Sequence, residues 1–135
     1  MYTNLIKNVL LINHGLGNKN HDTKHTPHIL KNHIKTENVI DLNLKGDLYD
    51  NLFNINKVSK EYNKDTLFLG GDHSLSIATI NAVYEPGMKV IWMDAHPDIN
   101  TKKSSKTKNI HGMPLSFLTG LQVSEYNINL PFSDI

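Results

Sequence analysis

Short apolar runs alternate with longer amphipathic stretches along the chain. Four such runs, bounded by turn-forming residues, predict buried β-strands at residues 7–13, 37–44, 66–69 and 89–93. Apolar positions at helical spacing predict helices at residues 26–34, from Asp47 or Asp50 to 63, and at residues 75–84 and 114–121. Thr26 and Pro27 supply the start of the first helix. Residues 18–25 and 100–109 are polar and predict loops, and the segment after 121 is expected to be weakly structured.

The order of these elements indicates the fold class. Strands that alternate with helices are typical of βαβ units and a parallel sheet, and strands that are apolar on both faces indicate helices on both sides. We therefore expect an α/β protein with three αβα layers. In such folds ligands bind at the carboxyl ends of the strands, so the chemistry is expected just after Leu69 and just after Met93.

Composition narrows the function classes. The 135 residues carry 39% hydrophobic residues, no cysteine and a formal net charge of +1, and every one of the fourteen cationic side chains is lysine. The absence of arginine and the balanced charge argue against nucleic-acid binding, and no apolar run approaches the roughly 18–20 residues that span a bilayer. We expect a cytoplasmic protein with no nucleic-acid or membrane partner. Thiolate metal sites and cysteine nucleophiles are excluded.

Acidic and imidazole side chains gather where the strands at 66–69 and 89–93 end. Asp94, His96 and Asp98 are spaced by two residues, which on an extended segment directs them to one side. His73 follows the glycines of Gly70-Gly71-Asp72-His73-Ser74 at the neighbouring site. Two carboxylates and imidazole form an oxygen and nitrogen ligand set that suits Mn²⁺, Zn²⁺ or a similar divalent ion. The alternatives are a solvated loop exit and, for the glycine turn, a phosphate-binding loop, although Asp72 stands where an anion would bind.

The remaining histidines carry less information. His111, between a polar loop and a helix start, could move protons at a water held by a metal. Five more lie in the first 33 residues at irregular spacing that fits no metal template, and we expect them to be solvated surface residues: His14, His21, His25, His28 and His33.

At these motifs the sequence resembles the arginase family of ureohydrolases. The resemblance covers residues 68–118 and rests on Gly-Gly-Asp-His-Ser, on Val-Ile-Trp-Met-Asp-Ala-His-Pro-Asp-Ile-Asn-Thr and on Asn-Ile-His-Gly-Met-Pro-Leu-Ser. It implies a manganese-dependent hydrolysis of the guanidino substrate L-arginine to ornithine and urea, by a water shared between two Mn²⁺ ions. His73, Asp94 and Asp98 would hold the first metal, and Asp94 and His96 the second.

The resemblance also assigns further site residues. His111 matches the proton-shuttling histidine of the family. Three positions match those that bind the α-carboxylate of the substrate: Asn100, Ser105 and Thr107. A Ser-Gly pair usual in the family is replaced by Thr107-Lys108, which disturbs the loop if the glycine position needs a positive φ.

Members of the arginase family use further active-site residues that residues 1–135 do not contain. Arginases use two more carboxylate ligands from a later Asp-x-Asp motif and a later Glu for the guanidinium group, and residues 1–135 contain neither. We therefore interpret residues 1–135 as a partial arginase-like catalytic domain that lacks the C-terminal half, and expect weak binding of one metal and impaired or absent activity. The alternatives are a non-catalytic binding module or decaying gene product, and an agmatinase or other ureohydrolase. The resemblance also suggests a homo-oligomer, and an uncovered sheet edge suggests association.

Overall fold

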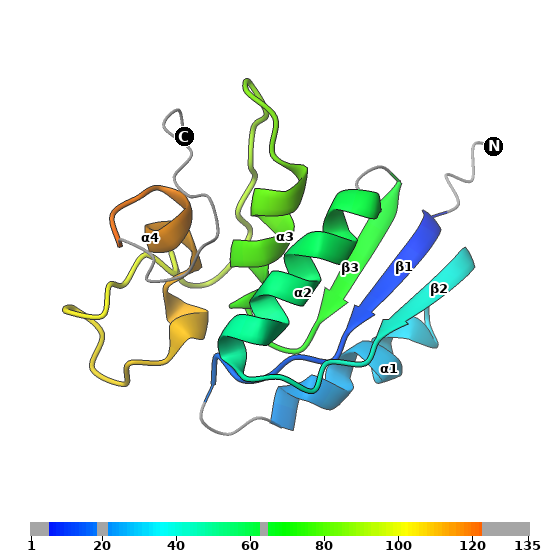
Figure 1. Cartoon of the computed structure of the whole chain (residues 1–135), viewed down its shortest axis with the longest axis horizontal. Coiled ribbons are helices and arrows are strands. Elements are labelled where there is room, and N and C mark those ends of the chain that lie inside the picture. The colour runs from blue at the N-terminus through cyan, green and yellow to red at the C-terminus, as the bar shows by residue number, and fades with distance from the viewer. Residues whose placement is uncertain (1–5, 19–21, 63–64, 123–135) are drawn as a thin grey trace.

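A parallel three-stranded sheet forms the centre of the protein. The structure, a computed structural model, describes residues 6–18, 22–62 and 65–122. The strands β1 (Ile6–Ile12), β2 (Thr36–Leu42) and β3 (Thr66–Gly70) lie in the order β2-β1-β3, and both pairings are parallel (Figure 1). Ile12 at the end of β1 is opposite Leu42 of β2 and Gly70 of β3, so the three strands end at one edge.

Helices cover both faces of the sheet. Helices α2 (Leu48–Glu61) and α3 (Leu75–Val83) lie on one face, and α1 (Thr26–Lys31), after the 3-10 turn η1 (Asp22–His25), lies on the other (Figure 1). A second turn, η2 (Ile110–Gly112), leads into α4 (Pro114–Leu118), which packs against α3. This arrangement confirms the predicted α/β class with helices on both sides of a parallel sheet.

The alternation of β1 divides the core between the two faces. Leu10 and Ile12 pack with the buried faces of α2 and α3, whereas Val9 and Leu11 pack with Leu69 on the opposite face. Successive side chains of a strand point to opposite faces, and both sets are apolar because helices cover both faces. A third cluster joins α3 to the C-terminal part through four buried residues: Ile77, Ile110, Met113 and Phe117.

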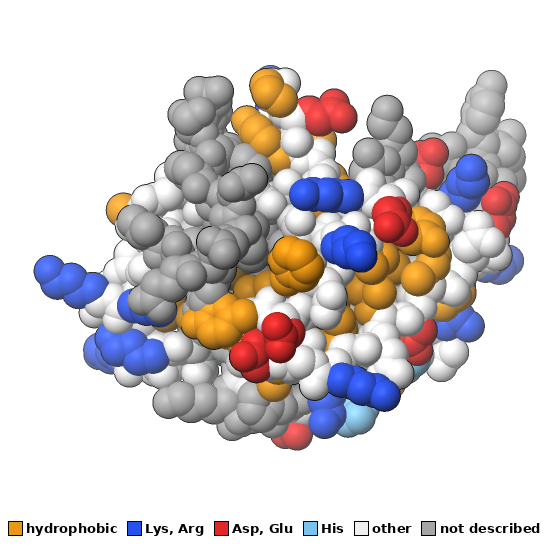
Figure 2. All heavy atoms as spheres, viewed as in Figure 1, with side chains coloured by type: hydrophobic (Ala, Val, Ile, Leu, Met, Phe, Trp, Pro, Cys, Tyr) orange, Lys and Arg blue, Asp and Glu red, His pale blue; other side chains and the backbone are white. Residues whose placement is uncertain are grey.

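Local chemistry explains where the long helix begins. Asp47 precedes α2 in an extended conformation, and its Oδ1 accepts hydrogen bonds from the backbone N–H groups of Tyr49 (2.8 Å) and Asp50 (3.0 Å). These bonds satisfy donors that have no partner within the helix. The structure therefore selects Asp47 over Asp50 as the cap. Figure 2 shows hydrophobic side chains at the surface over this helix. Among the residues of α2, Tyr49 and Phe53 are 42% and 62% exposed.

The predicted strand at residues 89–93 is wrong. Within the described residues this segment forms no ladder with a neighbour, and the side chains of Ile91 and Met93 are 83% and 89% exposed. Strand conformation depends on pairing with a neighbour, which this segment lacks here, so an apolar sequence alone does not make it a strand. Two helices also end earlier than predicted, α1 at Lys31 and α4 at Leu118. The prediction for the segment after 121 falls almost wholly outside the described residues.

The described residues contain no helix with the length and hydropathy required to cross a bilayer.

Candidate functional site

A tight turn at the end of β3 places His73 at the carboxyl edge of the sheet. Gly71 is required there because the loop after β1 passes very close: a Cβ at this position would lie 2.1 Å from the backbone oxygen of His14. Asp72 N–H donates to that same oxygen (3.2 Å), so the two loops are held together. The turn ends at Ser74, and α3 begins at the next residue. His73 thus lies between a strand end and a helix start.

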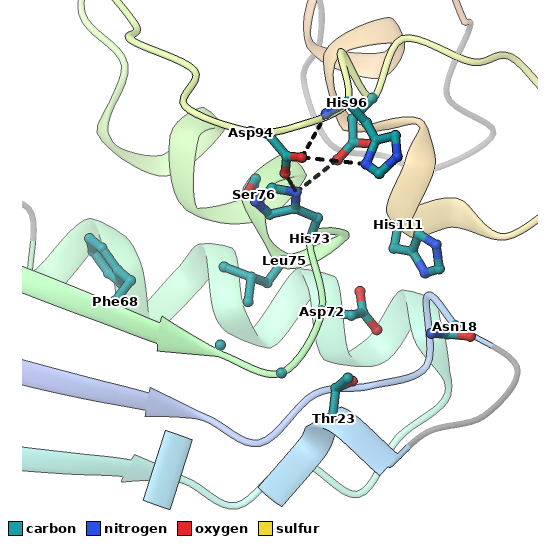
Figure 3. Close-up of a pocket in the computed structure, with 13 residues that line it drawn as sticks. Asn18, Thr23, Phe68, Asp72, His73, Leu75, Ser76, Asp94, His96 and His111 are labelled. Atoms are coloured by element: carbon teal, nitrogen blue, oxygen red, sulfur yellow. Dashed lines mark hydrogen bonds and ion pairs between the residues drawn. The ribbon is translucent and has the colours of Figure 1, made fainter. Parts of the chain in front are cut away.

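The two acidic residues of the second motif meet this histidine. His73 Nδ1 lies 2.9 Å from Asp94 Oδ2 and 2.7 Å from Asp98 Oδ2. One ligand atom from each residue lies within 4.8 Å of the others. Their side chains are 43%, 21% and 11% exposed, in the order His73, Asp94 and Asp98. The structure therefore brings His73, Asp94 and Asp98 of the two motifs together, and Figure 3 shows His73 and Asp94 facing one another beside a cavity.

The backbone around Asp98 is specialised. Its φ of +43° lies in the left-handed region, which costs free energy for a residue with a Cβ but is tolerated best by Asn and Asp. Leu115 N–H donates to the Asp98 carbonyl oxygen (3.1 Å), so the start of α4 supports this conformation. Such positions cluster at functional sites.

Asp94 is held in its charged form. Its Oδ1 accepts a hydrogen bond from the backbone N–H of His96 (2.8 Å), and this bond is the main cause that lowers the pKa of Asp94 below its ordinary value of 3.8. Desolvation opposes this shift, and the imidazoles of His73 and His96 add to it. The lowered pKa favours the ionised carboxylate, which is the form that binds a cation.

His96 does not join the cluster. Its side chain is 80% exposed, and its Nδ1 lies 3.6 Å from Asp94 Oδ1. The chain bends at residues 94–96 instead of running straight, so the two-residue spacing no longer directs all three side chains to one side. His96 still lines the same cavity as Asp94.

His111, in the turn η2, lines the same cavity as His73 and Asp94. The cavity, of about 570 Å³, is lined by His73, Asp94, His96, Asp98 and His111, with Asp72 and the end of β3 at its base (Figure 3). The backbone N–H of His111 donates to the carbonyl oxygen of Gly17 (3.2 Å), and this bond fixes η2 against the loop after β1. No contact drawn in Figure 3 joins the His111 ring to the cluster. The imidazole is therefore placed beside the cation donors rather than among them.

The three positions matched to substrate binding lie away from the cavity lining. Ser105 is buried (8% exposed), and its Oγ accepts a hydrogen bond from Lys108 N–H (3.0 Å). Asn100 Oδ1 accepts from the Ser104 hydroxyl (3.2 Å), and the Thr107 hydroxyl oxygen accepts from Asn109 N–H (3.3 Å). In this structure all three side chains stabilise their own loop.

The replaced glycine position does require a positive φ. Lys108 has a φ of +61°, in the region that favours glycine. The Lys108 ammonium group donates to the backbone oxygen of Lys102, which closes the loop across itself. The loop keeps its shape at the cost of strain in Lys108.

The expectation that His14 is a solvated surface residue is wrong. It is 1% exposed, and its Nε2 lies 3.0 Å from the Ser74 hydroxyl oxygen. The apolar run of residues 9–12 leads directly into it, and this was the available signal for burial. Three of the other N-terminal histidines, His25, His28 and His33, are exposed as predicted, and the fourth, at position 21, falls outside the described residues.

The sequence reasoning also missed an aromatic contact to His73. The Trp92 indole lies 4.9 Å from the His73 imidazole, centroid to centroid, with the rings tilted by 44°. Trp92 is the single tryptophan of the chain, so its fluorescence reports on the cation cluster.

These features define an α/β protein in which one imidazole and two carboxylates, a donor set that can hold a cation, meet at the carboxyl edge of a parallel sheet. Comparison with known proteins identifies its relatives. The model of the Arginase family matches residues 12–129, and the chain belongs to this family.

Individual relatives agree with the family match. The chain is 50% identical over 70 residues to the arginase of Saccharomyces cerevisiae, which is 49% of this chain and 21% of the yeast protein. It is 52% identical over 61 residues to bovine arginase-1, covering 44% of this chain and 19% of that protein.

Solved structures show the same fold. Arginase from Bacillus subtilis superposes with a TM-score of 0.71 at 30% identity, over 91% of this chain and 49% of that one. Entamoeba histolytica arginase in complex with L-ornithine superposes with a TM-score of 0.73 at 23% identity, over 87% of this chain and 50% of that one. The chain therefore spans about half the length of these structures.

Proposed function

We propose that this chain carries the first metal-binding half of the active site of a manganese-dependent ureohydrolase that hydrolyses L-arginine to ornithine and urea. The observation that carries the proposal is the convergence of His73, Asp94 and Asp98 within 4.8 Å in a chain of the arginase family. This convergence joins two motifs that lie some twenty residues apart in the sequence.

The donor set fits a divalent cation. Neighbouring ligands of an octahedral ion with bonds of about 2.1 Å lie about 3 Å apart, and the observed nitrogen–oxygen distances are 2.9 and 2.7 Å. A small widening would admit an ion between the three atoms. Two carboxylates and one imidazole also leave an ion such as Mn²⁺ with coordination positions for water.

The residues of the chain take different parts in the reaction. Asp94 and Asp98 supply the negative charge, and His73 in its neutral form supplies a nitrogen ligand. When bound, a divalent ion lowers the pKa of water and makes it a nucleophile at neutral pH. The position of His111 at the same cavity supports a role in carrying a proton to the departing amine. The cavity volume of about 570 Å³ suits a ligand the size of an amino acid.

A second metal has fewer donors in the described residues. The acids that line the cavity are Asp72, Asp94 and Asp98. Asp72 is already engaged, since its oxygens accept hydrogen bonds from Gly17 and Ser74. Asp94 and His96 would be left to hold the second ion. We therefore expect one Mn²⁺ per chain and slow or absent turnover by residues 1–135.

One observation favours a second candidate, an agmatinase-type reaction. The side chains matched to α-carboxylate binding, Asn100, Ser105 and Thr107, are turned to their own loop, and none lines the cavity. A guanidino substrate without a carboxylate would not need them. Comparison of urea release from L-arginine and from agmatine separates the two reactions.

The test measures Mn²⁺ binding and urea release with the purified 135-residue chain. We expect about one Mn²⁺ per chain, and we expect Asp98→Asn to weaken binding at least about tenfold because it removes a charged ligand. Asp41→Asn is the matched control, since this acid of β2 is exposed and its carboxylate lies 3.5 Å from the imidazole of His28 in α1. Equal Mn²⁺ affinity in the wild type and in Asp98→Asn would overturn the proposed site. Binding without urea release from either substrate would favour the non-catalytic alternative.

A further inference from the structure

A buried imidazole lies next to the cation cluster without belonging to it. His14 lies two residues after the end of β1, and its Nε2 lies 3.0 Å from the hydroxyl oxygen of Ser74. Both side chains are buried, at 1% and 0% exposure. Ser74 is the residue after the proposed ligand His73, so His14 contacts the turn that carries this ligand.

The residue before His73 is held by the same loop. Asp72 Oδ1 accepts hydrogen bonds from Ser74 N–H (2.8 Å) and from the Ser74 hydroxyl (2.5 Å), and Asp72 Oδ2 accepts from Gly17 N–H (2.9 Å). Because the single hydroxyl proton of Ser74 goes to Asp72, the Ser74 oxygen must accept from His14, and His14 carries its proton on Nε2. A chain of hydrogen bonds therefore runs from His14 through Ser74 and Asp72 back to Gly17.

The same loop also reaches the other imidazole of the cavity. Gly17 accepts the backbone hydrogen bond of His111 with its carbonyl oxygen. Gly17 can sit there because it has no side chain: a Cβ would lie 2.4 Å from the Ser74 hydroxyl oxygen. The loop from His14 to Gly17 thus lies between the turn that carries His73 and the turn that carries His111, and is hydrogen-bonded to both.

We propose that His14 is a positioning residue of the cation site, which orients His73 through Ser74 and places His111 through the loop that ends at Gly17. This inference rests on the proposed function for the identity of the cation. It goes beyond that function because His14 touches none of the proposed ligands. Residues on both sides of His73 are fixed by charged and buried hydrogen bonds, so the imidazole leaves the turn in one direction, toward the carboxylates. Loss of His14 removes the donor to the Ser74 hydroxyl oxygen and leaves a cavity beneath the turn.

The first measurement is the affinity for Mn²⁺, which is determined from the electron paramagnetic resonance signal of free Mn²⁺. We expect His14→Ala to weaken binding about 10–100-fold, the range found when an outer partner of a ligand is removed. His14→Gln keeps an amide N–H donor within reach of Ser74 and is expected to restore most of the affinity. His33→Ala, which removes an exposed imidazole, is the control and is expected to bind as the wild type does.

The second measurement needs no metal. In the metal-free protein, the imidazole resonances of His73 and His111 and the fluorescence of Trp92 report the position of the two turns. We expect all three to change in His14→Ala and to return toward wild-type values in His14→Gln. Far-UV circular dichroism establishes that each variant is folded. If His14→Ala does not fold, Ser74→Ala, which removes the hydroxyl and keeps the imidazole, replaces it with the same expected changes.

The two proposals fail in different ways. A wild-type chain that does not bind Mn²⁺ contradicts the proposed function, and the metal-free resonances of His73 and His111 then decide the role of His14. A wild-type chain that binds Mn²⁺, together with a folded His14→Ala variant of equal affinity and unchanged resonances, overturns the positioning role. Loss of affinity in His14→Ala without recovery in His14→Gln also contradicts it, since the effect would then come from packing rather than from the hydrogen bond.

Discussion

Gly71→Ala perturbs the contact on which the site turn depends. The added Cβ would lie 2.1 Å from the His14 carbonyl oxygen, 2.8 Å from the Thr23 carbonyl oxygen and 3.0 Å from Lys24 Cα. All three atoms belong to the backbone, so no rotation of a side chain can relieve the overlap. The loop after β1 and the turn after β3 must move apart by roughly 1 Å, because nonbonded carbon and oxygen atoms need more than about 3 Å.

The cost follows from what this movement breaks. Overpacking of a closely packed site destabilises a protein by about 1–3 kcal/mol. The movement also lengthens the hydrogen bond from Asp72 N–H to the His14 oxygen, now 3.2 Å. We expect a loss of about 2 kcal/mol in the free energy of unfolding, which shifts the urea midpoint by about 1 M.

Urea unfolding followed by far-UV circular dichroism and by Trp92 fluorescence measures this loss. Gly112→Ala is the matched control, because a Cβ at Gly112 meets no atom within 4 Å and its φ is not positive. We expect the control to unfold within about 0.5 kcal/mol of the wild type. Equal midpoints for the two variants would refute the close approach of the two loops, and with it the geometry on which the role of His14 rests.

Three further predictions concern the core, the helix start and the acid. Leu52→Ala, at a position with no exposure, should lower the free energy of unfolding by about 2–5 kcal/mol. Phe53→Ala, at the neighbouring position that is 62% exposed, should change the free energy of unfolding by less than about 1 kcal/mol. Similar losses in the two variants would contradict the assignment of the buried face of α2. Asp47→Ala removes the cap of α2 and should cost about 0.5–2 kcal/mol in urea unfolding, and an unchanged midpoint would contradict the cap. Because the pKa of Asp94 is lowered in the folded chain, its stabilising effect is present above the unfolded pKa and is lost as the pH falls through the folded pKa. A carboxyl ¹³C titration of Asp94 should therefore have its midpoint below 3.8, and a midpoint at or above that value would contradict the hydrogen bond.

The sequence predicts much of this fold because local signals and burial agree there. Strands β1 and β3 carry apolar side chains on both faces, β2 contributes Ile40 and Leu42 to one face, and α2 carries both a cap and an apolar face. The segment 89–93 has the same apolar character, yet pairing with a neighbour is a tertiary property that composition does not encode. The result is an extended segment with Ile91 and Met93 exposed rather than a fourth strand.

At the site, residue spacing predicts which groups meet but not how they point. His73, Asp94 and Asp98 meet because their segments end at the same edge of the protein. The bend at residues 94–96 and the left-handed φ of Asp98 turn His96 away, and neither is visible in a two-residue spacing. The burial of His14 depends on close contacts between distant loops at two glycines, Gly71 against backbone atoms and Gly17 against the Ser74 and Asp72 side chains, which no local pattern reveals.

The cation cluster is held by helices and loops rather than by strand pairing. The segment that carries Asp98 has no ladder to β3, so the acid and His73 need another connection. Asp98 is fixed to the start of α4 by the Leu115 hydrogen bond, and His73 precedes α3 by two residues. Helices α3 and α4 in turn share a core in which Phe117 is 1% exposed. Because this apolar packing sets the distance between the two ends of the site, the arrangement of the ligands depends on the core between α3 and α4 as much as on the ligands themselves.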